Sequence, residues 1–472
     1  LGAGFYYKTF MWPAAFWEQV YEPLIRKAAG LGRASYEADP DYHEKCWAHC
    51  DILVVGAGPA GLAASLTAGR AGARVILADE GFELGGALLR ETESIAGNST
   101  NEFRKKIITE LAALPNVTLL PRTTVFGWYD DNVFGAVERV QPHISQPDPY
   151  RPVEKLWRII ARETILATGA EERPLVFGGN DIPGVMLASA TRSYLNRHAI
   201  APGQRTVIFT TNRSGYKAAA DLEAAGLEVA AIIDPRAAGQ DTWTGKARVI
   251  HQAVVRDAHG GKNLTGVTIE ANGQAEHITA DALAMSGGWS PVIHLACHRG
   301  AKPVWSEEKA AFLAPQNLQG LRIAGAATGM ELTEACLGDG SIQACKSLEI
   351  LGFKKIDPAF TPIEETGYRV HTLWQVRNSK QKAFVDFQND VDAKDIELAV
   401  REGYGHVELT KRYTTNGMAT DQGKLSNINA IGILAQTRGV SPAEVQTTTF
   451  RPFYTPVSFG ALTGHAKGRN FQ

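Results

Sequence analysis

Residues 51–61, which read Asp-Ile-Leu-Val-Val-Gly-Ala-Gly-Pro-Ala-Gly, decide the fold of this chain. An apolar run of strand length leads straight into a glycine-rich turn, and the alanine-rich stretch 59–72 that follows suits a helix. A second apolar run at residues 74–79 suits another buried strand. A strand, a glycine turn, a helix and a strand within about 30 residues predict a βαβ unit with a parallel sheet.

The glycine spacing in this unit is typical of dinucleotide binding. Gly56 permits the tight turn, Gly58 lets the backbone approach a pyrophosphate, and Gly61 lets the helix pack close to the strand. The helix N-terminus then faces the phosphates. The alternative is a glycine-rich turn that binds no ligand. The candidate contacts are Gly56, Gly58, Pro59, Ala60 and Gly61.

An acidic residue stands where such folds recognise a ribose. Asp79 ends the second strand, and a carboxylate there accepts hydrogen bonds from ribose hydroxyls and repels a 2′-phosphate. This favours NAD or FAD over NADP. Glu80 is the neighbour that could take the same role, and Gly85 and Gly86 resemble a second turn on the phosphate side.

A second βαβ unit follows as an internal repeat, with a strand at 207–210, a helix at 213–225 and a strand at 228–234. Its turn, residues 210–215, reads Thr-Thr-Asn-Arg-Ser-Gly and keeps only the third glycine. Side chains at the first two positions crowd the close approach that a pyrophosphate needs. We expect this second unit to be retained as structure without binding a nucleotide in the usual way.

Three further stretches, at 163–169, 280–288 and 321–325, read as a strand followed by glycine, and the last of them leads into a small-residue helix expected at Asp339–Gly352. They add Thr168, Gly169 and Gly325 to the candidate contacts. The predicted fold class is α/β, a flavoprotein-like fold with two dinucleotide-binding domains and a small C-terminal helical module. The predicted divisions are an aromatic-rich extension (1–49), a first nucleotide-binding domain (50–170 and 280–356), an inserted second one (171–279), a linker (357–381), the helical module (382–440) and a tail (441–472).

Composition excludes some classes of partner. The formal net charge is −2, so no broad basic field collects nucleic acid, and no apolar run is long enough to span a membrane.

The five cysteines form no CxxC pair and predict free thiols in a reducing, cytoplasmic compartment. His294 and His298 lack a third ligand, so no metal site is predicted. The chain begins at Leu1 and stops in mid-sequence, which suggests part of a longer polypeptide.

The first 49 residues are rich in large aromatic side chains, which are too numerous to leave in water. Two interpretations stay open for this segment. It packs on another domain or subunit, or a short helix at about 14–29 covers the core of this same chain. The rings concerned are Tyr6, Tyr7, Phe10, Trp12, Phe16, Trp17 and Tyr21.

Several of these stretches together resemble the alpha subunit of heterotetrameric sarcosine oxidase, over nearly the whole chain. The first and last stretches are far more specific than the glycine turn. The stretches that carry the resemblance are GFYYKTFMWP at 4–13, 55–61 with Asp79-Glu80 and 84–86, SGGWSP at 286–291, AFVDFQNDV at 383–391, 411–424 and 447–460.

The resemblance implies a function for the assembled enzyme. Such enzymes oxidatively demethylate sarcosine to glycine at an FAD held by the beta subunit. Electrons pass to an FMN between alpha and beta and then to dioxygen, which gives hydrogen peroxide. The alpha subunit holds a tightly bound NAD. The resemblance implies that Gly56, Gly58, Gly61 and Asp79 bind it in this chain. Partners would be the beta subunit and the smaller gamma and delta subunits, with no nucleic acid and no membrane.

The helical module resembles the iron–sulfur module of related amino-acid dehydrogenase subunits. The positions that correspond to the cluster cysteines hold Asp386, Gln388, Asp421 and Ser426, so the four thiolates that a cluster needs are missing. We therefore expect the module to serve as structure only.

The tail is the candidate FMN contact. Hydroxyls and a guanidinium in a row suit a phosphate, and with the resemblance they point to Thr448, Thr449 and Arg451. The alternative is an extended strand whose arginine pairs with a local carboxylate.

Family alpha chains are about twice this length and carry an N-terminal ferredoxin-like domain and a C-terminal folate-binding domain. Neither is here, so no folate site is predicted, and no catalytic residue is named.

Three functions compete on this sequence. The first is the nucleotide-binding and electron-transfer part of a sarcosine oxidase alpha chain. The second is an FAD-dependent amino-acid dehydrogenase or reductase subunit, against which the missing cysteines and the altered second turn argue. The third is a non-catalytic scaffold that binds NAD and docks partners, which the aromatic N-terminal stretch would fit.

Overall fold

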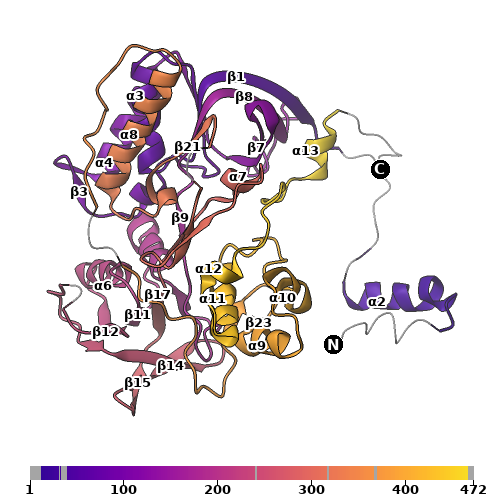
Figure 1. The fold of residues 1–472 in the computed structure, drawn as a ribbon, viewed down its shortest axis with the longest axis vertical. Coiled ribbons are helices and arrows are strands. Elements are labelled where there is room, and N and C mark those ends of the chain that lie inside the picture. The colour runs from indigo at the N-terminus through magenta and orange to yellow at the C-terminus, as the bar shows by residue number, and fades with distance from the viewer. Residues whose placement is uncertain are drawn as a thin grey trace.

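The computed structural model describes residues 12–30, 32, 40–239, 242–315, 318–365 and 369–465. Within these ranges the chain forms two α/β units with parallel strands, followed by a small helical unit (Figure 1). The predicted fold class is therefore confirmed.

The first unit is built on a seven-stranded sheet with the order β5-β2-β1-β8-β7-β6, in which β21 also pairs with β8. Most neighbours run in parallel, whereas β6 and β7 are antiparallel additions at one edge. Its strands are β1 (His43–Val55), β2 (Val75–Ala78), β5 (Val117–Leu120), β6 (Thr123–Trp128), β7 (Val133–Arg139), β8 (Glu154–Leu166) and β21 (Leu321–Ile323). Its main helices are α3 (Pro59–Arg70), α4 (Thr100–Ala113) and α8 (Thr333–Ile350).

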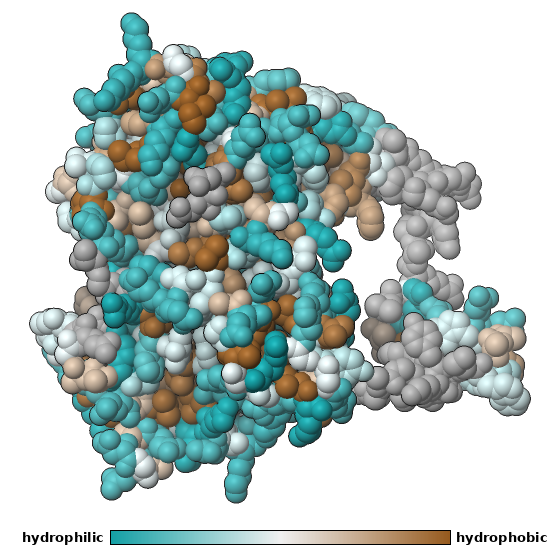
Figure 2. All heavy atoms as spheres, viewed as in Figure 1, coloured by the Kyte–Doolittle hydropathy of each residue, from teal (hydrophilic) through white to brown (hydrophobic). Residues whose placement is uncertain are grey.

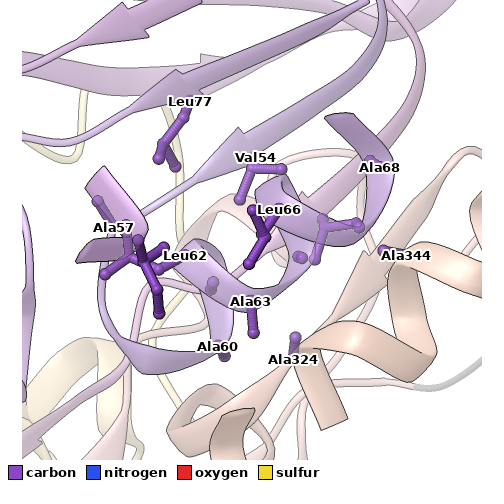
Figure 3. Close-up of a cluster of buried hydrophobic side chains, with 14 of the residues drawn as sticks. Val54, Ala57, Ala60, Leu62, Ala63, Leu66, Ala68, Leu77, Ala324 and Ala344 are labelled. Atoms are coloured by element: carbon purple, nitrogen blue, oxygen red, sulfur yellow. The ribbon is translucent and has the colours of Figure 1, made fainter. Parts of the chain in front are cut away.

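Small residues let α3 lie between the sheet and α8. Its side chains from Ala60 to Gly69 are all buried, and a Cβ at Gly340 of α8 would lie 2.1 Å from the carbonyl oxygen of Ala60. Figure 3 shows this alanine- and leucine-rich cluster, in which Val54 and Leu77 of the sheet face Leu62 and Leu66 of the helix. The alanine-rich stretch that predicted this helix is thus buried along nearly its whole length.

Two predicted boundaries in this unit are wrong. β1 begins at His43, so the extension ends earlier than residue 49. The first half of β1 alternates between exposed and half-buried residues and pairs with β8 from Glu154 onward, which an apolar-run criterion misses. The last helix also begins at Thr333 rather than at Asp339.

The second unit has a five-stranded parallel sheet with the order β10-β17-β11-β12-β13 and a three-stranded antiparallel sheet beside it. The parallel strands are β10 (Val185–Leu187), β11 (Arg205–Thr210), β12 (Glu228–Asp234), β13 (Val249–His251) and β17 (Ala282–Ser286). The antiparallel strands are β14 (Ala253–Gly260), β15 (Leu264–Ala271) and β16 (Gln274–Thr279). Its helices are α5 (Ala188–Arg192), η4 (Ser193–Arg197) and α6 (Ser214–Ala224).

The strand β17 corrects the predicted division at residue 280. It pairs with β10 and β11 in the second sheet, so the chain leaves this unit only after Ser286. The two crossings between the units lie side by side, because β9 (Ala170–Glu172) pairs antiparallel with β18 (Trp289–Pro291). A crossing point of this kind depends on pairing between residues far apart in the chain, which local patterns do not reveal.

The helices predicted for the C-terminal module are confirmed as α9 (Ala393–Arg401), α10 (Val407–Thr414) and α11 (Asn427–Arg438). The stretch predicted as a linker, 357–381, has no helix or strand where it is described, yet Val370 and Trp374 are buried against this module. The remaining short elements are η2 (Gly86–Leu89), β3 (Ser94–Ile95), β4 (Asn98–Ser99), η3 (Asp130–Asn132), α7 (His294–Cys297), β19 (Val304–Ser306), β20 (Ala311–Leu313), η5 (Gly325–Thr328), β22 (Phe384–Asp386), β23 (Val391–Asp392), α12 (Pro442–Val445) and α13 (Phe459–Thr463).

The N-terminal segment forms η1 (Trp17–Tyr21) and α2 (Glu22–Ala28), and none of their residues is buried. Figure 1 shows this segment apart from the body, so the interpretation in which it covers the core of this chain is wrong. Trp12 is 85% exposed, and the predicted rings at Tyr6, Tyr7 and Phe10 lie outside the described residues. The face of the body seen in Figure 2 carries scattered hydrophobic patches between larger hydrophilic areas. Among the described helices, none is both long and apolar enough to cross a membrane.

Candidate nucleotide-binding site

A crevice with a volume of about 630 Å³ opens beside the first glycine turn. It is within the size range of roughly 300–1,000 Å³ that is usual for small-molecule sites. Nine predicted site residues line it together, and they come from the glycine turn, the end of β2, the η2 turn and the end of β8. They are Gly56, Gly58, Pro59, Ala60, Asp79, Glu80, Gly86, Thr168 and Gly169.

The glycine turn has the shape that a pyrophosphate needs. Gly56 has a φ of 98°, and a Cβ on Gly61 would lie 1.8 Å from the carbonyl oxygen of Gly56. A Cβ on Gly58, by contrast, would meet no protein atom within 4 Å, because this glycine faces the crevice. Gly58 is also the N-cap of α3, whose first N–H groups make no intrahelical bond. The turn therefore fits a bound phosphate pair.

Asp79 fastens this turn to the end of β2. Its carboxylate accepts hydrogen bonds from the N–H of Ala57 at 2.5 Å and of Gly81 at 2.7 Å. Burial raises the pKa of Asp79, while the two backbone donors lower it. Each carboxylate oxygen keeps a further lone pair, so Asp79 can still accept from a ribose. Glu80 is exposed at the rim of the crevice.

The other two predicted glycines, Gly85 and Gly325, support the crevice from behind, and Thr168 holds its wall in place. The N–H of Gly85 donates to the carbonyl of Ala57 at 2.9 Å, and a Cβ on Gly325 would lie 2.5 Å from the Cβ of Ala60. Thr168 donates its hydroxyl proton to the carbonyl oxygen of Val292 at 2.6 Å, which joins the end of β8 to the returning crossing strand.

The turn of the second βαβ unit is filled by its own side chains. Asn212 is fully buried, and it donates to Ser286 and accepts from the N–H of Ser214 at 2.8 Å. Asp234, at the end of β12, forms a buried ion pair with Arg236 at 2.8 Å and accepts from the hydroxyl of Tyr216 at 2.7 Å. The position that would meet a ribose is thus already occupied by protein donors.

The three tail residues lie outside the crevice. Thr448 is buried, and the N–H of Thr449 donates to Glu408 at 2.9 Å. Arg451 is exposed and makes no hydrogen bond or ion pair with any described residue. The alternative in which this arginine pairs with a local carboxylate is therefore not seen within the described ranges. Tyr454 and Thr455, which follow directly, do reach the crevice or a smaller cavity next to it.

Three of the four positions of the helical module that resemble cluster ligands make ordinary side-chain hydrogen bonds, and the hydroxyl of the fourth, Ser426, has no hydrogen-bond partner among the described residues. Asp386 accepts from the N–H of Gly417 at 2.7 Å, and the N–H of Asp421 donates to the side chain of Gln388 at 3.4 Å. The hydroxyl of Ser426 is buried. Among the described residues, no group of three His, Cys, Asp or Glu side chains is placed to hold a metal ion.

His294 and His298 lie one turn apart in and after α7, with ring centroids 5.8 Å apart. His294 stacks on Tyr454 at 4.2 Å, and burial lowers its pKa well below the usual range. Burial likewise lowers the pKa of His298 to about 4. Both imidazoles are packed into the core beside the crevice.

Sequence reasoning missed several charged residues and a tryptophan of the crevice. Arg90, Glu171, Glu172, Trp289 and Lys424 all line it. They come from the end of η2, from both crossing strands and from the helical module, so only the folded chain brings them together. The one local signal was that Arg90 closely follows the Gly85-Gly86 turn.

Buried ion pairs hold the second unit against the first. Arg192 of α5 pairs with Glu91 at 2.9 Å and with Asp221 at 2.6 Å, and all three side chains are at most 9% exposed. Nearby, Arg213 pairs with Glu365 at 2.9 Å. These contacts fix the wall of the crevice that faces the second unit.

The chain is similar to known proteins along its whole length. Residues 380–465 match the sarcosine oxidase A3 domain, and residues 51–132 match the FAD dependent oxidoreductase family. The sarcosine oxidase subunit alpha of Rhizobium meliloti (strain 1021) is 62% identical over 100% of this chain and 48% of its own length. That of Corynebacterium sp. (strain P-1) is 40% identical over 93% of this chain and 48% of its own length. The chain thus spans about half the length of these curated relatives.

A solved structure shares the fold. The L-proline dehydrogenase from P. horikoshii has a TM-score of 0.68 at 19% identity, and the match covers 89% of this chain and 80% of that chain. The resemblance that the sequence predicted is confirmed by the relatives.

Proposed function

Since the chain belongs to the family of sarcosine oxidase alpha subunits, of which it spans about half, we propose that it is the NAD-binding and FMN-facing part of such an enzyme. The assembled enzyme would convert sarcosine to glycine at an FAD on a beta subunit and pass electrons through a shared FMN to dioxygen, giving hydrogen peroxide. Gamma and delta subunits would complete the assembly. We propose the cytoplasm as its compartment, because all five cysteines are free thiols.

One observation carries the NAD proposal. Of the two βαβ units, the first has a glycine turn open toward a crevice, whereas the turn of the second is filled by Asn212 and its ribose position by Arg236. A single dinucleotide would therefore bind, along the turn from Gly56 to Gly61, with Asp79 accepting from a ribose. Its binding to the folded chain would stabilise the first unit by mass action.

The role of this chain toward the flavin would be to complete a pocket. A bound flavin would supply the ability to accept and release electrons. We propose that Arg451 donates to its phosphate, because this guanidinium is exposed and makes no ion pair with a described residue. Thr448 would contribute only after the tail adjusts, since it is buried, whereas Thr449 is exposed and uses only its backbone N–H, which donates to Glu408.

A second candidate function is an FAD-dependent dehydrogenase subunit that holds FAD in the first site. The match of residues 51–132 to the FAD dependent oxidoreductase family favours it. The filled second turn argues against it, since a reductase of this architecture needs a second nucleotide there.

Nucleotide release tests the proposal. The chain is purified alone and co-expressed with a candidate beta subunit, each sample is denatured, and the released nucleotides are separated by chromatography with absorbance detection. We expect NAD from the lone chain and FMN only from the complex. FAD from the lone chain would favour the dehydrogenase, and no nucleotide from either sample would contradict NAD binding and leave only a role in docking partners.

A further inference from the structure

A second cavity, with a volume of about 1030 Å³, is separate from the nucleotide crevice. It lies where the first sheet splits: β7 pairs with β8 as far as Ile160, and β21 pairs with the same edge only from Thr164. No described strand therefore lies beside residues 161–163 on that edge, while β1 pairs with the other. The η5 segment divides the two spaces, since Ala326 lines the crevice and Thr328 lines the cavity, and no described residue lines both.

Cationic side chains outnumber acidic ones in the described lining of this cavity. Arg322 of β21 is 25% exposed, and its terminal nitrogens are accessible and make no hydrogen bond with a described residue. Glu163 joins β21 to α8, because its Oε2 lies 3.6 Å from Nε of Arg322 and accepts from the hydroxyl of Ser347 at 3.5 Å. The neighbouring Lys346 is exposed and makes no ion pair in the described ranges. The lining cations are Arg162, Arg299, Arg322 and Lys346, and the lining acids are Asp131 and Glu163.

The other two arginines are only loosely paired. Arg162 lies 3.5 Å from Asp51, whose carboxylate is held more closely by Arg74 at 3.0 Å. Arg299 lies 3.6 Å from Asp130, which is 93% exposed. Exposed ion pairs of this kind contribute little to stability. Both guanidinium groups can therefore turn toward an anion in the cavity without a large cost.

The apolar part of the lining is aliphatic. It includes Leu321, Ile323 and Ile350, and no aromatic side chain lines the cavity in the described part of the chain. Nucleobases are commonly held by stacking on aromatic rings, which this lining does not offer. The cavity thus suits a ligand that combines an anionic group with an aliphatic body.

We propose that this cavity binds an aliphatic anion, whose carboxylate or phosphate group is held by Arg322 and Lys346. The planar fork of a guanidinium matches both kinds of anionic group, and an ammonium adds a point charge. The site shares no residue with the proposed NAD or FMN contacts, so it does not depend on either of them.

Calorimetric titration tests both parts of the ligand. The purified chain is titrated with hexanoate, with hexyl phosphate, with inorganic phosphate (which lacks the aliphatic body) and with hexanol (which lacks the charge). We expect hexanoate or hexyl phosphate to bind at least about tenfold more tightly than inorganic phosphate and hexanol, because buried CH₂ groups and charged hydrogen bonds both add affinity. The tighter of the two identifies the anionic group that the site prefers.

Substitutions locate the bound probe. Arg322→Met should weaken binding of the tighter probe by at least about tenfold, and Arg322→Lys should keep part of the affinity. Lys346→Met changes an exposed side chain that makes no ion pair with a described residue, so the variant should fold normally and bind about two- to fivefold more weakly. Lys105→Met, at an exposed position of α4 outside the cavity, should bind as the original chain does. Gly58→Val, in the nucleotide crevice, should also leave the affinity unchanged.

Each part of the proposal can fail separately. Inorganic phosphate that binds as tightly as hexyl phosphate would overturn the aliphatic part, and hexanol that binds as tightly as hexanoate would overturn the anionic part. Unchanged affinity in both Arg322→Met and Lys346→Met, or loss of binding in Gly58→Val instead, would overturn the location. The site is also refuted if none of the four probes binds to the original chain.

Discussion

Glu171, beside the crevice, makes the stability of the chain depend on pH. Burial raises its pKa from 4.5 to about 7, although Lys424 lowers it. The unfolded chain has the ordinary pKa, so between pH 4.5 and 7 the folded state binds more protons than the unfolded state. The free energy of unfolding therefore falls as pH rises through this window and stays low above it. At 1.36 kcal/mol per pKa unit, the charged carboxylate costs about 3 kcal/mol at pH 8.

Glu171→Gln removes this cost. We expect the variant to be about 3 kcal/mol more stable than the original chain at pH 8 and much closer to it at pH 5. For a chain of this length unfolding as one unit, that difference raises the midpoint of thermal unfolding by about 3 °C. Differential scanning calorimetry of nucleotide-free protein at both pH values measures it.

The control is Glu110→Gln. The ion pair with Arg70 lowers the pKa of Glu110, so this substitution should lower rather than raise the midpoint at pH 8. The reasoning is refuted if Glu171→Gln lowers the midpoint at pH 8 or raises it equally at both pH values.

Three further changes test other parts of the structure. Arg192→Met leaves the buried carboxylates of Glu91 and Asp221 without a cation and should cost about 3–5 kcal/mol in chemical denaturation; an unchanged midpoint would contradict the ion-pair account. Gly61→Ala puts a methyl carbon 1.8 Å from a carbonyl oxygen of its own turn, so both thermal stability and retained nucleotide should fall, and full nucleotide content would count against it. Arg451→Met should reduce FMN recovered from the complex with a beta subunit without changing the thermal midpoint of the lone chain; equal FMN recovery would exclude a role for this guanidinium.

The parts of the fold that follow local patterns were predictable from the sequence. The bounds of β12 agree with the predicted strand at 228–234, and α3 and β2 lie within the predicted ranges. In each case a glycine or an acidic residue marks the end of a buried apolar run. The glycines of the first turn were likewise found by spacing, because the tight turn and the close approach require glycine there.

What depends on pairing between distant residues was not predictable. The first half of β1 alternates between exposed and half-buried residues without an apolar run, and it is a strand because β8 pairs with it. β17 lies in the second sheet because it pairs in parallel with β11. The crevice residues Arg90 and Glu172 have no shared motif, since the antiparallel crossing of β9 and β18 is what brings the second one to the crevice.

The most direct test of the central claim, that the first glycine turn binds a dinucleotide, is the nucleotide content of Gly58→Val. A side chain at this N-cap would meet no protein atom within 4 Å of its Cβ and would enter the space assigned to the pyrophosphate. The change of N-cap residue itself should cost only about 1 kcal/mol. We predict that this variant folds with a similar thermal midpoint in the nucleotide-free state and releases no NAD on denaturation, whereas the original chain does. A folded variant that releases as much NAD as the original chain would contradict the account.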